Sequence, residues 1–382
     1  MIVATGVGRG DAQSADEGTP LPTAGPALGG DRVFWGEETL ESISVLMRAP
    51  GSGPQVVYRH RSTPSKQDWA TVGIAASPSL VAFSRAWNSC GGGVCGYGGD
   101  DLWTGRPRGP FSRYANAPYL PCGSGLSFDV EGGAVVFSES FCRRGAERSH
   151  VVLRRFPNGS AIEVENAPAK AYCCGGVSIA GNFVAWHAGR AIVVYDRAAR
   201  RTAYRAALPN GSQRGVDFDL GVDGTVVVAI DNRRGITNYD EPLLGGLFQF
   251  SPGQPAPRPR RLRGRANIDR SGRRLRLAGG KLLYNRHLTA TSSELVLSGF
   301  AGKHRRLAHF GPGEGLTGDL DMTSERAAWA SRKDTELRRQ CIGGVCRTVA
   351  DGVIRIWVTR IDRRGNEPRL VAERPYSGLH PL

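Results

Sequence analysis

The sequence predicts an all-β protein that folds as one seven-bladed β-propeller with four antiparallel strands in each blade. Three observations support this prediction. The 382 residues include 52 glycines and 23 prolines, which separate short apolar segments. Long segments with helical apolar spacing are scarce. One apolar segment, which mostly ends on a large aromatic side chain, recurs along the chain between other strand-like pieces.

The recurring segment is the clearest sign of a repeat. Its seven copies are "DRVFW" ending at Trp35, "SLVAF" at Phe83, "GAVVF" at Phe137, "NFVAW" at Trp186, "TVVVA" at Ala229, "KLLYN" with Tyr284, and "RAAW" at Trp329. Successive copies are 48, 54, 49, 43, 55 and 45 residues apart. A period near 50 is typical of stacked supersecondary units. Seven copies predict seven blades, with six or eight as the alternatives.

The strands of one unit follow one another along residues 176–207. "VSIA" forms the innermost strand, "FVAWH" the second, "AIVVYD" the third and "RTAYRA" the outermost. The same order predicts blades near 24–60, 70–116, 122–166, 173–208, 214–263, 266–310 and 315–374. We expect the propeller to occupy residues 20–376, with a flexible segment at 1–19 and a short tail at 377–382.

The ring follows from how such units must pack. A four-stranded sheet with apolar residues on both faces needs a neighbour on each side, and a closed ring gives every sheet two neighbours. The first and last units each contain all four strands. Two modes of closure therefore stay open: face packing between blades 1 and 7, or addition of the N-terminal segment to the last blade.

The unit "VSIAGNFVAWHAGRAIVVYDRAARRTAYRA" resembles the TolB-like and related WD40-like propeller repeats of bacterial envelope and secreted proteins. In those repeats a turn of small residues leads to a second strand that ends on an aromatic residue, and an aspartate closes the third strand. The likeness covers most of the chain as a pattern of apolar residues and turns. The "GH…WD" signature is missing, the "SPDG" turn is mostly missing, and TolB-like rings usually have six blades. The resemblance therefore implies no particular partner.

The eight cysteines favour disulfides. "CGGGVC" (Cys90, Cys95) and "CIGGVC" (Cys341, Cys346) follow second strands, where a hairpin tip would bring each pair together. The spacing is not that of a zinc site, and no histidine lies nearby. Cys122, Cys142, Cys173 and Cys174 leave three pairings open, and a bridge from Cys122 to the vicinal pair would join blades 3 and 4.

Disulfides predict an oxidising compartment, and hence a secreted or envelope-associated protein. The N-terminal segment "MIVATGVGRGDAQSADEG" is consistent with this, because its apolar start and its small residues Ala12 and Ala15 resemble the end of a secretory signal. No apolar run is long enough to cross a bilayer as a helix.

All eight cysteines are expected on one face of the ring, together with the longest insertions at 85–100, 231–244 and 331–351. Loops pinned by disulfides keep a defined shape, which favours a binding face for a protein or a glycan. The candidate contact residues are of the types enriched at interfaces: Trp87, Tyr97, Arg233, Arg234, Tyr239, Arg338 and Arg339.

A second candidate site lies on the innermost strands, which line the channel. Its carboxylates are Asp129, Asp217, Asp219, Asp319 and Asp321. Converging aspartates could bind calcium or act as an acid/base pair, so a polysaccharide hydrolase or lyase is an alternative function. The simpler interpretation is that they bond to neighbouring backbone or to arginines between blades. We expect no other cofactor or metal, and no catalytic motif is present.

The formal net charge of +15 comes from 45 arginines and only five lysines. The densest run, from Arg258 to Arg276, would suit a polyanion, which gives a third function class. Nucleic acid is not the expected partner, because no aromatic residues interleave the run for base stacking. Taken together, the sequence favours a monomeric, non-catalytic binding scaffold.

Overall fold

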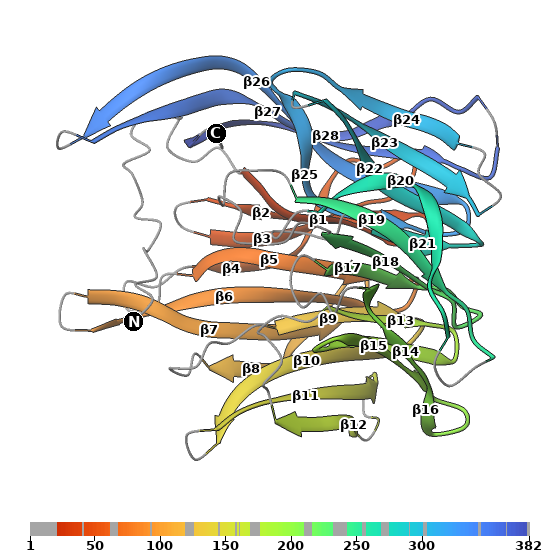
Figure 1. The fold of residues 1–382 in the computed structure, drawn as a ribbon. Helices are drawn as coiled ribbons and strands as arrows, with labels where there is room; N and C mark the ends of the chain where they lie inside the picture. The colour runs from red at the N-terminus through yellow and green to blue at the C-terminus, as the bar shows by residue number, and fades with distance from the viewer. Residues whose placement is uncertain are drawn as a thin grey trace.

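A computed structural model confirms the seven-bladed propeller with four antiparallel strands in every blade (Figure 1). It describes residues 21–379 except 40–41, 62–67, 92–93, 119–125, 144–145, 157–158, 160, 169–175, 210–215, 232–242, 254–256, 269–274, 290, 301–303, 343–344 and 364. No α-helix occurs among these residues. Residues 1–19, predicted as a flexible segment, lie outside the described part, and of the tail predicted at 377–382 only residues 377–379 are described, at the end of the last strand.

The blades follow the chain in order, and each is named here by its number and its strands A to D. Blade 1 is β1 (Leu21–Gly29), β2 (Arg32–Glu38), β3 (Ser42–Arg48) and β4 (Gln55–Arg61). Blade 2 is β5 (Asp68–Ala76), β6 (Val81–Gly91), β7 (Val94–Gly105) and β8 (Phe111–Pro118). Blade 3 is β9 (Leu126–Glu131), β10 (Ala134–Arg143), β11 (Ala146–Arg155) and β12 (Ala161–Pro168). Blade 4 is β13 (Val177–Ala180), β14 (Phe183–Ala188), β15 (Ala191–Asp196) and β16 (Arg201–Ala207).

The remaining three blades complete the ring. Blade 5 is β17 (Val216–Leu220), β18 (Val226–Asp231), β19 (Leu243–Phe250) and β20 (Arg260–Ile268). Blade 6 is β21 (Leu275–Ala278), β22 (Lys281–Thr289), β23 (Ser292–Gly299) and β24 (His304–Phe310). Blade 7 is β25 (Glu314–Met322), β26 (Arg326–Ile342), β27 (Val345–Arg360) and β28 (Arg369–Leu379). A bridge between Ala266 and Arg286 links the sheets of blades 5 and 6.

The recurring segment forms the B strand of every blade. Its anchor residues are all buried: Trp35, Phe83, Phe137, Trp186, Ala229, Tyr284 and Trp329. These strands alternate their side chains between the two faces of the blade, so each contributes to the packing against both neighbours. The sequence period therefore reflects the need of every blade to fill two interfaces.

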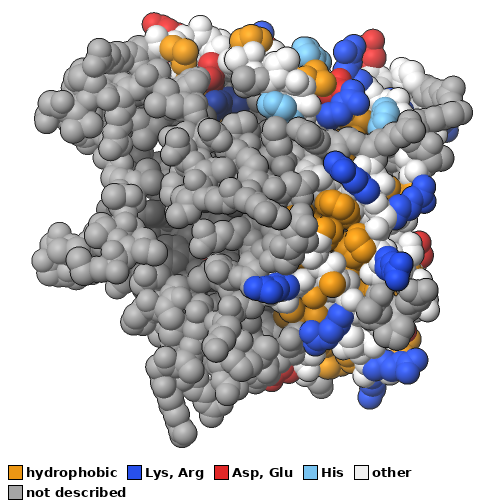
Figure 2. All heavy atoms as spheres, viewed as in Figure 1, with side chains coloured by type: hydrophobic (Ala, Val, Ile, Leu, Met, Phe, Trp, Pro, Cys, Tyr) orange, Lys and Arg blue, Asp and Glu red, His pale blue; other side chains and the backbone are white. Residues whose placement is uncertain are grey.

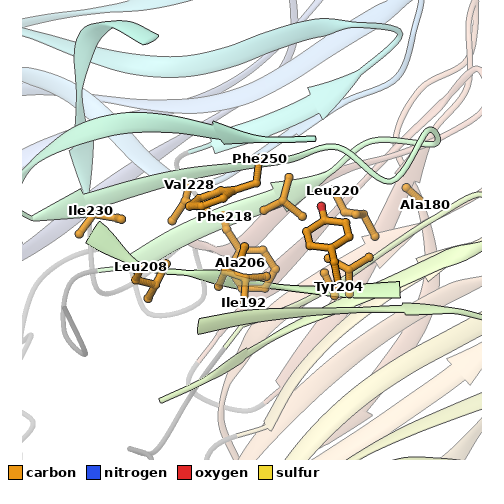
Figure 3. Packing of buried hydrophobic residues seen from close by; sticks show 13 residues of the cluster. Ala180, Ile192, Tyr204, Ala206, Leu208, Phe218, Leu220, Val228, Ile230 and Phe250 are labelled. Atoms are coloured by element: carbon orange, nitrogen blue, oxygen red, sulfur yellow. The ribbon is translucent and has the colours of Figure 1, made fainter. Parts of the chain in front are cut away.

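The core is divided into seven apolar clusters, one in each interface between adjacent blades. Figure 3 shows the cluster between blades 4 and 5, where Tyr204 and Ile192 of one sheet pack with Phe218 and Leu220 of the next. Tyr204 also donates a hydrogen bond to the Gly224 carbonyl across the interface, at 2.5 Å. Burial of this kind on both faces is the main stabilising term of each blade.

The ring closes by face packing of blades 1 and 7. Leu28 and Trp35 of blade 1 share one apolar cluster with Ile356 and Val371 of blade 7. Each of the two blades is a sheet of four consecutive strands, so no strand is exchanged between them. The first of the two expected closure modes is therefore the one that the described residues show.

The insertions predicted in blades 2 and 7 are continuous antiparallel ladders. β6 and β7 stay paired from Val81–Gly105 to Gly91–Val94, and β26 and β27 from Arg326–Arg360 to Ile342–Val345. In Figure 1 the β26–β27 hairpin extends well beyond its blade, on the same side as the β6–β7 hairpin.

Candidate functional site

The A strands form the inner ring of the propeller, because each contacts the A strand of the blade on either side. Three of them carry a buried aspartate toward the shared centre: Asp129 on β9, Asp219 on β17 and Asp321 on β25. These strands belong to alternate blades, 3, 5 and 7. The intervening blades 4 and 6 place Ser178 and Arg276 at the corresponding point of their own A strands.

Each of the three aspartates bonds to the backbone of the next blade. Asp129 Oδ2 accepts a hydrogen bond from the Ile179 N–H at 3.2 Å, and Asp219 Oδ2 accepts one from the Leu277 N–H at 2.7 Å. Asp321 Oδ2 accepts one from the Leu28 N–H at 2.6 Å, across the closure between blades 7 and 1. The carboxylates thus act as clamps between the A strands of adjacent blades.

Arg276 supplies the positive charge of this cluster. Its Nε and Nη2 donate to Asp321 Oδ1 at 3.0 and 2.7 Å. Its Nη1 lies 3.7 Å from Asp219 Oδ1 and 3.9 Å from Asp129 Oδ2. One guanidinium therefore serves carboxylates from three blades, which is the kind of multiple contact that its planar set of donors permits.

The electrostatics of the cluster are unbalanced, with three carboxylates to one guanidinium. Burial raises the pKa of Asp219, and the nearby Asp129 raises it further, against the lowering effects of Arg276 and of the hydrogen bond from Ser178. Burial alone would lower the pKa of Arg276, but the three carboxylates raise it well above its ordinary value. The guanidinium stays charged, whereas Asp219 holds its proton to a higher pH than a free aspartate does.

The structure thus brings together three of the five predicted channel carboxylates. Asp217 and Asp319 lie two residues before Asp219 and Asp321 and are partly buried. Arg276 was not among the predicted site residues. The signal that could have found it is its place in "LRLA", a short A strand where a charged side chain must point toward the channel.

The geometry favours the simpler interpretation of these carboxylates. Their oxygens are occupied by backbone N–H groups, a serine and an arginine, all of which neutralise or anchor them. Among the described residues no group of histidine, cysteine and carboxylate side chains is arranged to hold a metal ion. The contacts of this cluster join adjacent blades.

The backbone register bears on two of the cysteine pairs. Cys90 lies directly opposite Cys95 in the β6–β7 ladder, and Cys341 lies directly opposite Cys346 in the β26–β27 ladder. Directly opposed residues of antiparallel strands have Cα atoms about 4.5–5.5 Å apart, which lies within the range of a disulfide. Cys142 is opposite Glu147 in the β10–β11 hairpin. Cys122, Cys173 and Cys174 lie outside the described residues.

The predicted contact residues fall into two groups. Trp87 and Tyr97 belong to the β6–β7 hairpin, and Arg338 and Arg339 to β26 of the blade 7 hairpin. Arg233, Arg234 and Tyr239 lie outside the described residues. The first group is thus on the two hairpins that carry the opposed cysteines.

The arginine run from Arg258 to Arg276 does not form one patch. Arg258 and Arg260 are exposed at the turn before β20 and at its start, whereas Arg276 is buried in the channel cluster. The two ends of the run therefore lie in different environments.

The described part of the chain contains no helix that is long and apolar enough to span a membrane.

No family model and no curated protein sequence matches the chain. Solved structures that are similar include the WD40 domain of SCAP from fission yeast, with 8% identity and a TM-score of 0.34 over 91% of this chain and 72% of that one. Hsv2p of Kluyveromyces lactis has 10% identity and a TM-score of 0.43, covering 92% of this chain and 98% of that one. A protein from Lactobacillus plantarum has 12% identity and a TM-score of 0.43, covering 77% of this chain and 86% of that one. The seven-bladed β-propeller fold of the chain rests on its own sheet topology.

Proposed function

We propose that this protein is a non-catalytic binding scaffold, secreted or held in the cell envelope, that binds a protein partner through the extended hairpins of blades 2 and 7. The β-propeller is a fold typical of binding scaffolds, although the fold alone assigns no function. The observation that carries the proposal is the pairing of β6 with β7 and of β26 with β27 out to opposed cysteines, with one register shift in each ladder. Both hairpins extend on the same side of the ring (Figure 1).

A disulfide at each tip is part of the proposal. A paired hairpin that extends beyond its blade has fewer neighbours than the body of the ring, and a covalent link at its end limits fraying. Such links persist in an oxidising compartment. The likeness of the repeat to TolB-like propellers of the bacterial envelope agrees with that location.

The channel chemistry also supports a scaffold over a polysaccharide hydrolase or lyase. A general acid or base has to reach a substrate, and a nucleophile needs a free lone pair. Asp129, Asp219 and Asp321 are buried, and one oxygen of each carboxylate accepts a hydrogen bond from a backbone N–H of the next blade. These contacts give the three carboxylates a task in assembling the ring.

The first experiment is peptide mapping of the protein, exported into an oxidising compartment, without reduction. We expect the linked peptides Cys90–Cys95 and Cys341–Cys346. Free thiols at these four positions would contradict both the disulfides at the hairpin tips and the extracytoplasmic location that is inferred from them.

The second experiment shortens the hairpins. Residues 88–98 and 339–348 are each replaced by Asn-Gly, which joins residues that face each other across the ladders. We expect the melting temperature of the ring to change little, while an extracytoplasmic protein captured by the wild type is lost. An identical set of captured proteins would overturn the proposal. Turnover of a polysaccharide that Asp219→Asn abolishes would establish the enzyme instead.

A further inference from the structure

The turns between strands C and D carry a second, separate surface. Because strands alternate in direction, these turns and the A–B turns lie on the face opposite the extended hairpins. Exposed arginines occur at or beside the C–D turn in blades 2 to 7. We call this set the basic rim; it comprises Arg106, Arg108, Arg155, Arg200, Arg201, Arg258, Arg260, Arg261, Arg306 and Arg363. In Figure 2, Lys and Arg side chains are spread over the right-hand part of the described surface, where Figure 1 places such turns.

The arginines of the basic rim form few contacts with acidic side chains, although Asp362 lies near Arg363. No carboxylate of the described residues forms an ion pair with any of its ten guanidiniums. Other arginines near these turns do have partners: Arg360 pairs with Asp362 at 2.6 Å, and Arg305 donates to the Arg363 carbonyl at 2.8 Å. The unpaired arginines are therefore a distinct subset of the arginines in these turns.

The C–D turn of blade 4 illustrates how closely the arginines lie on this face. Burial lowers the pKa of Arg197 in the blade 4 turn, and the nearby Arg155 of blade 3 lowers it further. Arg200 adopts φ of 51°, in the left-handed region that glycine or asparagine occupies more readily. Arg200 is exposed and lies in the four-residue turn that joins β15 to β16.

The arrangement of charge favours a chain-like anion over a flat anionic surface. Inside the rim, the A–B turns are mixed, with Asp31, Asp223 and Glu325 beside Arg326 and Lys281. A membrane laid across this face would bring its headgroups against the inner acids as well as the outer arginines. Among the described residues, the outer C–D turns carry Asp196, Asp362 and Glu367 against the ten rim arginines, so a linear polymer that follows these turns meets mainly positive charge.

The aromatic residues near the rim favour a polysaccharide over a nucleic acid. Single-stranded nucleic acids are bound by charge together with aromatic rings that stack on bases. Phe111, Phe156, Tyr195 and Phe300 lie near these turns, but each packs against an apolar cluster between blades. What the rim offers is guanidinium groups, which pair with carboxylate or sulfate in planar, two-bond geometry.

We infer that the basic rim binds a linear anionic polysaccharide, with carboxylate or sulfate groups along its length, on the face opposite the hairpins. This surface shares no residue with the proposed hairpin face, so either can fail while the other stands. The rim also differs from the arginine run, since it draws on six blades and excludes Arg276.

The test measures binding of heparin and of polygalacturonate, with neutral dextran as the control ligand, at two salt concentrations. The rim variant is Arg200→Gln, Arg201→Gln, Arg258→Gln and Arg260→Gln. The matched control removes four exposed arginines away from the C–D turns: Arg59→Gln, Arg61→Gln, Arg190→Gln and Arg205→Gln. Both variants lose the same net charge.

We expect the rim variant to bind either anionic polymer at least about tenfold more weakly, with a shallower dependence on salt, because fewer counterions are released on binding. The control should stay within about twofold of the wild type. Equal losses in the two variants would show that only the net charge of +15 matters and would overturn the inference. Equal or tighter binding of single-stranded DNA, or of vesicles rich in phosphatidylglycerol, would also overturn it.

Discussion

Arg276 is the residue on which the centre of the ring depends most. It is the cation shared by Asp129, Asp219 and Asp321, and it lies 12% exposed among them. A buried charge cluster of this kind is weak evidence for stability as a whole, but removal of one partner leaves the others uncompensated. Single substitutions in this cluster therefore test how much its contacts stabilise the ring.

We expect Arg276→Met to destabilise the protein by about 3–5 kcal/mol, because three buried carboxylates would then share no cation. Arg258→Met, in the same arginine run but exposed, should change the free energy of unfolding by no more than about 0.5 kcal/mol. Urea denaturation of both variants gives the comparison. Similar losses of unfolding free energy in the two variants would show that the contacts of Arg276 with the three carboxylates do not stabilise the ring.

Asp219 should make stability depend on pH. Its pKa is raised in the folded state by burial, so the folded protein binds this proton more tightly than the unfolded chain does. The wild type should then gain stability relative to Asp219→Asn as the pH falls from 7 toward about 4. Melting temperatures of the two proteins across this range measure the difference. A difference that is constant, or that moves the other way, would contradict the assigned direction.

At the scale of elements, the approach of β25 to β1 demands glycine. Gly318 has φ of 64°, and a Cβ atom there would lie 2.6 Å from the Gly25 carbonyl oxygen of blade 1. Gly280 has a similar φ of 68°, in open space. Both glycines adopt a left-handed backbone conformation, but only at Gly318 would an added Cβ atom collide with a neighbouring strand.

We expect Gly280→Ala to cost about 1–2 kcal/mol, which is the penalty for a left-handed conformation alone. Gly318→Ala should cost about 1–3 kcal/mol more, in the range of overpacking, since β25 and β1 must move apart. Thermal unfolding of both variants separates the two effects. Equal costs would mean that the two strands can adjust without loss.

The extended hairpins show how local sequence sets the length of an element. β26 continues through the mostly polar stretch "SRKDTELRRQCI" to Ile342, and β27 begins at Val345. The sequence predicted an insertion with its cysteines at a hairpin tip. It did not predict that the strands would stay paired all the way, because cross-strand pairing depends on a partner that local pattern does not identify.

At the scale of the whole molecule, every blade depends on its two neighbours, including blade 1 on blade 7. Leu28, Trp35 and Val371 share the cluster that closes the ring, and Asp321 bonds to the Leu28 N–H in the same interface. A closed ring of this kind has no free end from which a blade can separate first.

We therefore expect Trp35→Ala to weaken the whole ring by about 3–5 kcal/mol through the cavity that it leaves. Unfolding should still occur in one transition, coincident by far-UV circular dichroism and by tryptophan fluorescence. Val56→Ala, at an exposed site on the outer strand β4, should have an effect of at most about 0.5 kcal/mol. Two separate transitions for Trp35→Ala would show that blade 1 opens on its own.

The sequence by itself determined the all-β class and the repeat of four strands, favoured seven blades over six or eight, and placed Trp35, Trp186 and Trp329 in B strands. Alternation and period are local properties of the chain, so they can be read before any contact is known. Only the tertiary structure decided that Asp129, Asp219 and Asp321 converge on Arg276, and that closure uses face packing. Those residues are separated by whole blades along the chain, and only the curvature of the closed ring brings their side chains within bonding distance.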